Sequence, residues 1–294
     1  MTTSALTETA HGADAPASGV DPARAQTGAR HVALWLIDGA LLGCFMLSVA
    51  VFVGLIESPA SPLRAHLPWP LVRNALIGLA MGLTLIALVY SPWGGRSGAH
   101  MNPAFTIAFW RLGKIGSTDA AGYIAAQLLL GLAGTYLGAL LMGAWFTEPP
   151  VTYAPTLPGR WGVWVAFSAE FAMTFTLMGA VLVCSNTKRL APYTGLAAAC
   201  LLATFITFES PISGMSLNPA RTLASAIPAG RFDALWIYIA GPIAGMVLAA
   251  EVFRNLRALP RVHCCKLNHA RHEPCVFCGC DGPIDFDAHR DDPR

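Results

Sequence analysis

Residues 97–104 read SGAHMNPA, and residues 213–220 read SGMSLNPA. The two stretches align without gaps and are identical at five of eight positions: Ser, Gly, Asn, Pro and Ala. One such Asn-Pro is most simply a helix start, because Asn caps the first free amide groups and Pro suits the first helical position. Two copies in one register indicate instead an internal repeat, which governs the choice of fold.

Each copy opens an apolar stretch that is about half as long as a membrane span. These stretches cover residues 102–110 and 218–227, whereas a helix that crosses the hydrocarbon layer needs about 20 residues. Six other segments are long enough to cross, at about 32–56, 71–90, 120–146, 161–184, 191–208 and 234–253. The sequence therefore predicts an all-α membrane protein with six transmembrane helices and two re-entrant half-helices.

The two halves of the chain are predicted to have opposite topology. The first copy follows the second span and the other copy follows the fifth, so each half contributes three spans. Inverted repeats with interrupted helices place a substrate pathway where the halves meet. We expect repeat one at about 31–146 and repeat two at about 160–256, within one membrane domain over 31–256. Asp38 and Glu170 are acids at equivalent depths of the two halves, and we expect them to face the interior and find partners.

The composition agrees with a membrane protein and excludes other classes. Of the 294 residues, 54% are hydrophobic and 12% are charged. The net charge of +2, without a basic cluster, argues against a nucleic-acid partner. No set of acid, base and nucleophile lies within the spans, so we do not expect an enzyme. Residues 1–30 have few large apolar groups and are predicted to form a disordered arm that is not cleaved as a leader.

The distribution of lysine and arginine predicts the orientation of the chain in the membrane. These residues concentrate in the arm, in the second and fourth connectors, and after the sixth span. Basic connectors stay in the cytoplasm. We therefore expect both termini on the cytoplasmic side of a cell membrane, either the plasma membrane or the bacterial inner membrane.

At the two Asn-Pro-Ala motifs the chain resembles the aquaporin (major intrinsic protein) family, over about residues 34–254. Gly241-Pro242 in the sixth span and the acids of spans one and four carry the resemblance further. It implies a passive channel for water that excludes protons and ions, needs no cofactor and forms a homotetramer in the bilayer. Asp38 departs from the family, in which Glu is usual. The six residues at the pore centre would be Asn102, Pro103, Ala104, Asn218, Pro219 and Ala220.

The resemblance also implies a narrower filter around Arg221, the residue that follows the second motif. Its partners would be Ile206, the carbonyl of Met215, and either Met81 or Gly82. Water-selective relatives usually have His where this chain has Ile206, so we predict a more apolar filter that admits more than water. A bulky Met81 would instead keep the pore narrow and specific for water.

A few residues bear on which branch of the family the chain resembles. Thr222 stands where glycerol facilitators typically carry Asp. Ser213-Gly214 and Ile206 resemble plant-type channels that pass metalloid acids and small solutes. A facilitator of glycerol, metalloid acids or small solutes is therefore the alternative to a water channel.

The segment 257–294 is a cytoplasmic tail rich in cysteine and histidine. A Cys-x-x-Cys spacing with further thiols and imidazoles suits zinc or another soft metal. The candidate ligands are Cys264, Cys265, His269, His272, Cys275, Cys278 and Cys280. A reducing cytoplasm argues against a structural disulfide. The alternatives are a redox-sensitive or disordered tail, and a channel-like protein whose tail senses metal.

Three pairs of glycines four residues apart predict close approach of membrane helices. They are Gly78 with Gly82, Gly134 with Gly138, and Gly241 with Gly245. Such packing serves the bundle or a tetramer equally well.

Overall fold

The structure is a computed structural model that describes residues 22–256, 259–269, 275–280 and 286, with side chains from residue 28 onward. Six helices in this part of the chain are long and apolar enough to cross a membrane. They are α1 (Pro22–Glu57), α3 (Pro70–Val89), α6 (Ser117–Met142), α8 (Val163–Ser185), α9 (Thr194–Ser213) and α11 (Ile237–Asn255). The predicted spans correspond to these six helices, with boundaries that differ by up to ten residues.

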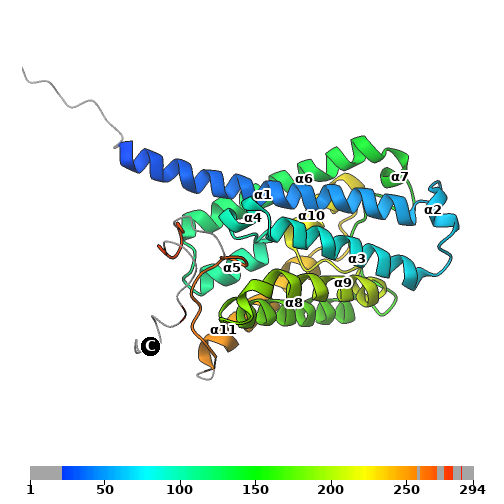
Figure 1. Cartoon of the computed structure of the whole chain (residues 1–294). Coiled ribbons are helices and arrows are strands. Elements are labelled where there is room, and N and C mark those ends of the chain that lie inside the picture. Colours follow the sequence, from blue (N-terminus) through cyan, green and yellow to red (C-terminus); the bar gives the residue numbers. More distant parts are fainter. Residues whose placement is uncertain (1–21, 257–258, 270–274, 281–285, 287–294) are drawn as a thin grey trace, which may run out of the picture.

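Two half-helices, α5 (Pro103–Arg111) and α10 (Pro219–Ala229), begin at the two motifs and lie inside the bundle (Figure 1). Four short helical turns connect the longer elements: α2 (Pro62–Ala65), α4 (Pro92–Ser97), α7 (Ala144–Thr147) and η1 (Ala191–Tyr193). We call the end where α1 begins and α11 finishes the terminal end. The opposite end carries α2 and α7.

The helix contacts repeat between the two halves of the chain. Helix α1 packs along α6, and in the second half α8 packs along α11. Half-helix α5 packs against α11, whereas α10 packs against α6, so each half-helix is held by the other half's last helix. Helix α3 meets its counterpart α9 directly. This exchange places the beginnings of α5 and α10 face to face at mid-depth.

Glycines bring the paired helices into backbone contact. A Cβ atom built on Gly134 of α6 would lie 2.2 Å from the Gly43 carbonyl oxygen of α1. The equivalent Cβ on Gly245 of α11 would lie 2.4 Å from the Phe171 oxygen of α8. Since neither backbone can yield without separating the helices, small residues are required at these crossings.

The outer surface is apolar, as contact with lipid requires. Leu140 of α6 is 80% exposed. Exposed tryptophans lie near both ends of the bundle: Trp69 and Trp164 at the opposite end, and Trp93 and Trp110 at the terminal end. Aromatic rings at these levels match the two membrane interfaces.

The structure corrects one boundary of the expected N-terminal arm. Helix α1 begins at Pro22, so residues 22–30 are helical and not part of a disordered segment. Proline is well placed at the first helical position, and the Ala, Arg and Gln that follow are good helix formers. The rest of the predicted arm, residues 1–21, lies outside the described residues.

Candidate functional site

The half-helices α5 and α10 are capped by the asparagines of the two motifs. The Asn102 side-chain oxygen accepts a hydrogen bond from the Ala104 amide at 2.9 Å. The Asn218 oxygen accepts from the amides of Ala220 (3.0 Å) and Arg221 (3.2 Å). With its oxygen directed into the helix start, each asparagine presents its NH₂ group to the space between the half-helices.

The two NH₂ groups bond across the repeat. Asn102 donates to the Leu217 carbonyl at 2.8 Å, and Asn218 donates to the Met101 carbonyl at 2.7 Å. Each carbonyl belongs to the residue just before the opposite asparagine, so the exchange is reciprocal. An amide nitrogen carries two hydrogens. One N–H of each asparagine thus fastens the halves together, and the other remains for a molecule in the cavity.

Two loops precede the motifs, residues 98–101 (the first loop) and residues 214–217 (the second loop). Their backbones have the same irregular conformation. Positive φ angles occur at Gly98, Ala99 and Met101, and again at the three equivalent residues Gly214, Met215 and Leu217. A non-glycine residue adopts such angles only when its surroundings enforce them. Irregular backbone at membrane depth is tolerated beside protein or a polar cavity, where its amide and carbonyl groups find partners.

Buried acids hold both loops. Asp38 accepts hydrogen bonds from the amides of His100 (2.9 Å) and Met101 (2.8 Å). Glu170 accepts from the amides of Ser216 and Leu217, both at 2.7 Å. The shorter Asp38 carboxylate thus reaches the first loop as Glu170 reaches the second.

Sequence reasoning missed the tyrosines that complete this arrangement. Tyr123 donates to the Ser97 carbonyl, and Tyr238 donates to the Ser213 carbonyl, each at 2.6 Å. Both rings are fully buried. The signal was present in the sequence, since each tyrosine follows its SG motif by nearly the same number of residues. Gln127 was missed as well; it donates to Asp38 at 2.7 Å from α6.

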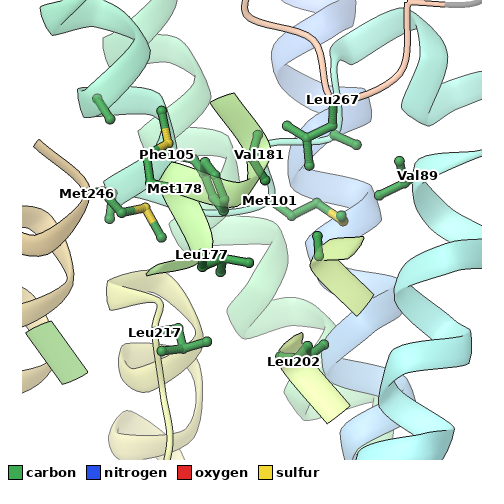
Figure 2. Packing of buried hydrophobic residues seen from close by; sticks show 14 of the residues in the cluster. Val89, Met101, Phe105, Leu177, Met178, Val181, Leu202, Leu217, Met246 and Leu267 are labelled. Carbon is green, nitrogen blue, oxygen red and sulfur yellow. The ribbon is translucent and has the colours of Figure 1, made fainter. Parts of the chain in front are cut away.

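A cavity of about 510 Å³ runs along the loops and both asparagines. Leu177 and Leu202 lie on its apolar wall, near Met101 and Leu217 in Figure 2. At the opposite end it is bordered by Glu57, an acid that pairs with Arg73 at 2.8 Å. Sequence reasoning overlooked this ion pair, although Arg73 lies within the predicted second span.

Four of the five predicted filter residues line this cavity: Arg221, Ile206, Met215 and Met81. Gly82 does not; its missing Cβ would lie 3.1 Å from the Ala199 oxygen of α9. The Arg221 guanidinium donates to the Ala154 carbonyl at 2.9 Å and is therefore fixed in place. Ile206, which was predicted to face Arg221 in the filter, has a side chain that cannot form hydrogen bonds.

The described tail brings four of the predicted ligands together. One ligand atom each from Cys264, His269, Cys275 and Cys278 lies within 4.8 Å of all the others. Cys265 is outside this group; its carbonyl accepts from the His100 ring at 2.8 Å. The Cys280 thiol contacts the Cys278 carbonyl instead. His272 lies outside the described residues.

Hydrogen bonding within this group favours thiolates at two of its cysteines. Hydrogen bonds with Cys264 lower the pKa values of the Cys275 and Cys278 thiols below the ordinary value. Hydrogen bonds with Cys265, and then with Cys275 and Cys278, raise the pKa of Cys264. Burial lowers the pKa of His269, but hydrogen bonds to Cys275 and Cys278 raise it by more.

The chain is similar to a known protein family and to several plant proteins. The model of the family described as major intrinsic protein matches residues 39–253. Aquaporin NIP1-3 of Oryza sativa subsp. japonica is 36% identical over 182 residues, which make up 62% of this chain and 62% of that relative. Nodulin-26 of Glycine max is 32% identical over 182 residues, covering 62% of this chain and 65% of its own length. The alignments thus span less than two thirds of these relatives.

A solved structure has the same fold. The aquaglyceroporin from Plasmodium falciparum superposes with a TM-score of 0.60, covering 78% of this chain and 96% of that one, at 19% sequence identity. At this identity the likeness establishes the arrangement of helices alone. The six spans and two half-helices are thus an aquaporin-like fold.

Proposed function

The chain belongs to the major intrinsic protein (aquaporin) family, and from this membership we propose that it is a passive membrane channel for water and small uncharged solutes. The observation that carries the proposal is the reciprocal bonding of Asn102 and Asn218 beside the cavity. Family members are channels and not enzymes, and their pore requires no cofactor.

Ion exclusion follows from the half-helices. Their beginnings point at each other, and each helix N-terminus carries roughly half an elementary positive charge. The Arg221 guanidinium adds a full charge to the cavity wall. Among the described residues that line the cavity, the only acid is Glu57 at the opposite end, so a cation or proton meets this field uncompensated between the two asparagines. Water meets fixed N–H donors and backbone carbonyls, to which it binds weakly enough to move on.

We propose that the filter is formed by Arg221, Ile206, Met81 and the Met215 carbonyl. Its apolar side favours solutes with a carbon body and a polar edge. The similarity to plant aquaporins supports this broader selectivity, because Ser213-Gly214 and Ile206 already resemble plant-type channels. Glycerol, urea and metalloid acids are therefore the candidate solutes besides water.

The test is flux into liposomes that contain the purified protein, both metal-loaded and metal-stripped. In at least one of these two states, water should cross faster than in empty liposomes, protons should not, and glycerol or urea should cross measurably. Replacing Ile206 with His should lower glycerol and urea flux while water flux persists. Ile206→Val, which stays apolar, is the matched control. Water flux without any solute flux in the parent would restore the strict water channel.

We place both termini on the cytoplasmic side of a cell membrane, because the arginines and lysines of the connectors gather at the terminal end. The family also implies a homotetramer, for which the exposed leucines of α6 offer an apolar face. Native mass spectrometry of the detergent-solubilised protein measures the oligomer.

The Cys/His group of the tail supports a second property. We propose that Cys264, His269, Cys275 and Cys278 bind one soft metal ion per chain. Their ligand atoms already lie within 4.8 Å of one another. Metal analysis of the intact protein and of Cys275→Ser/Cys278→Ser tests this, since equal metal contents in both would contradict the site.

A further inference from the structure

The described part of the tail lies against the cavity instead of extending away from the bundle. Cys264, Cys265, Leu267 and Cys275 are each at most 4% exposed and belong to the same buried cluster as Met101. Cysteine and leucine bury readily, but a hydrophilic chain end reaches this depth only when something holds it there.

The geometry of the cysteine and histidine group fits a tetrahedral metal site. The sulfur atoms of Cys264 and Cys275 are 3.7 Å apart. A zinc–sulfur bond of about 2.3 Å gives a tetrahedron edge of about 3.8 Å, whereas disulfide sulfurs lie about 2.05 Å apart. The His269 ring nitrogen Nε2 lies 3.2 Å from the Cys278 sulfur. Three thiols and one imidazole make a zinc ligand set of the closed, structural kind.

The local backbone presents two of these thiols together. The amide of Gly279 donates to the Cys275 carbonyl at 2.8 Å, and the amide of Cys275 donates to the Cys280 carbonyl at 3.0 Å. Gly279 has φ +70, which a residue without a Cβ adopts readily. The turn brings Cys275 and Cys278 to one side, as a Cys-x-x-Cys ligand pair requires.

The segment between the ligands Cys264 and His269 forms hydrogen bonds with the first loop of the cavity and with the residues just before it. We call residues 264–269 the tail loop. The Cys265 carbonyl accepts from His100 Nε2 at 2.8 Å, and the Leu267 amide donates to the Gly98 carbonyl at 3.1 Å. Lys266 donates to the Gly95 carbonyl at 3.0 Å. Three consecutive residues thus bond to the segment that leads into the first Asn-Pro-Ala.

Leu267 lies at the terminal end of the cavity. Its side chain is 4% exposed and lines the same cavity as Met101 and Asn102. Figure 2 shows it projecting from the tail into the cluster that contains Val89, Val181 and Met101. An apolar side chain in a single-file passage displaces water without offering it a hydrogen bond.

We infer that a zinc ion bound by Cys264, His269, Cys275 and Cys278 holds the tail loop in place, so that Leu267 plugs the mouth of the pore in the metal-loaded protein. Loss of the metal releases the loop and opens the channel. The inference rests on the proposed channel function and adds a regulatory ligand to it. The free ion, or a cytoplasmic carrier that exchanges it, is the effector.

The physical reason lies in the short chain between the ligands. Cys264 and His269 enclose Leu267 in a loop of six residues, and a metal bond across such a loop removes most of its freedom to leave. Without the metal, docking of the tail loop depends on three hydrogen bonds, to His100, Gly95 and Gly98, and on the burial of Leu267 and the neighbouring cysteines. Since the ion binds the folded tail and not the released one, it shifts the equilibrium toward the closed form.

The experiment compares three full-length proteins in liposomes under reducing conditions. They are the parent, Leu267→Ala, which keeps all four ligands, and Cys275→Ser/Cys278→Ser, which loses two. Cys44→Ser/Cys200→Ser, which changes two exposed cysteines of the spans, is the matched control. Each is measured with bound zinc and after treatment with a zinc chelator. The readouts are zinc per chain, water permeability, and trypsin cleavage after Lys266.

The parent and the control should bind one zinc ion, resist cleavage, and become several-fold more permeable when zinc is removed. Leu267→Ala should keep its zinc ion yet be permeable in both states. The Cys275→Ser/Cys278→Ser protein should be permeable without treatment. Equal permeability of the zinc-loaded and stripped parent, while water still flows, overturns the plug. Absence of bound zinc overturns the metal site.

The same experiment distinguishes a failure of the proposed channel function from a failure of the metal-held plug. If no variant passes water while zinc still protects Lys266 from trypsin, the tail docks as described, and the proposed channel function and the plug both fall. If permeability is high and zinc neither binds nor protects, the channel stands without the metal-held tail.

Discussion

At the scale of single residues, Asn102 and Asn218 each perform two tasks with one amide group. The oxygen caps a half-helix, and the nitrogen bonds to the other repeat. The sequence predicts the capping, because Asn-Pro is a familiar helix start. The cross-repeat bonds could not be predicted, since nothing local identifies Leu217 and Met101 as partners.

Replacing Asn218 with Ala removes the cap, worth about 1 kcal/mol, and the bond to the Met101 carbonyl. We expect water permeability to fall several-fold or protons to leak, because the donors that orient water are lost. Stopped-flow light scattering and a pH-sensitive dye inside the liposomes measure the two effects. Asn255→Ala is the control, since Asn255 donates to the Glu251 carbonyl at the exposed end of α11 and does not line the cavity. Unchanged values for both Asn102→Ala and Asn218→Ala would remove the assigned roles.

Asp38 is the second residue whose chemistry can be tested directly. Both of its oxygens accept hydrogen bonds from the first loop or from Gln127. Asp38→Asn turns one acceptor into a donor that faces N–H groups, and a buried unsatisfied group costs about 1–3 kcal/mol. Asp38→Glu keeps both acceptors and adds one methylene in a fully buried site, at a cost of roughly 1 kcal/mol.

The expected order of stability is therefore parent, Asp38→Glu, then Asp38→Asn. Thermal unfolding in detergent, followed by tryptophan fluorescence, provides the ranking. If Asp38→Asn were as stable as the parent, the carboxylate would not be what holds the first loop.

At the scale of elements, the helices were predicted better than their ends. Apolar composition and length identify the six spans, because about 20 consecutive apolar residues have few other uses. The fifth span continues to Ser213 although Pro211 lies inside it, and its predicted end at 208 was too early. A proline within a helix removes one backbone hydrogen bond. A prediction from local sequence therefore ends the helix before Pro211, whereas packing in the bundle keeps the segment helical.

In the tail, the metal-binding chemistry could be predicted from the sequence, but the docking of the tail on the bundle could not. The ligand types and the Cys-x-x-Cys spacing are local and predicted a metal site. The docking of Leu267 against Gly98 joins residues 169 positions apart in the chain, and no composition or periodicity encodes it. Cys265 and Cys280 could not be separated from the four clustered ligands by spacing alone.

The crossing of α1 and α6 provides an element-scale prediction. Gly134→Ala places a methyl group on the Gly43 backbone, and overpacking of this kind costs about 1–3 kcal/mol. Gly179→Ala in α8 is the matched control, because no atom lies within 4 Å of its built Cβ. That substitution should be neutral or stabilising by about 0.5–1 kcal/mol, since alanine favours a helix. Equal unfolding temperatures for both variants would refute the close crossing.

At the scale of the whole molecule, the proposed orientation sets which compartment the tail meets. Basic residues of the connectors gather at the terminal end, so the tail and its cysteines should face the cytoplasm. A green fluorescent protein fused after Arg294 should fluoresce in a bacterial host, and alkaline phosphatase fused there should be inactive. Fusions in the connector between α6 and α8 should give the reverse pattern. The same pattern at both sites would exclude the predicted topology.

The reciprocal bonds between the repeats also govern how the protein is made. Asn102 and Leu217 are 115 residues apart, and a ribosome adding about 5–20 residues per second needs on the order of ten seconds to cover that distance. During this time the first half-helix waits at mid-bilayer without its partner carbonyl. We therefore expect the nascent first half to need shelter from the insertion machinery until the second half-helix arrives.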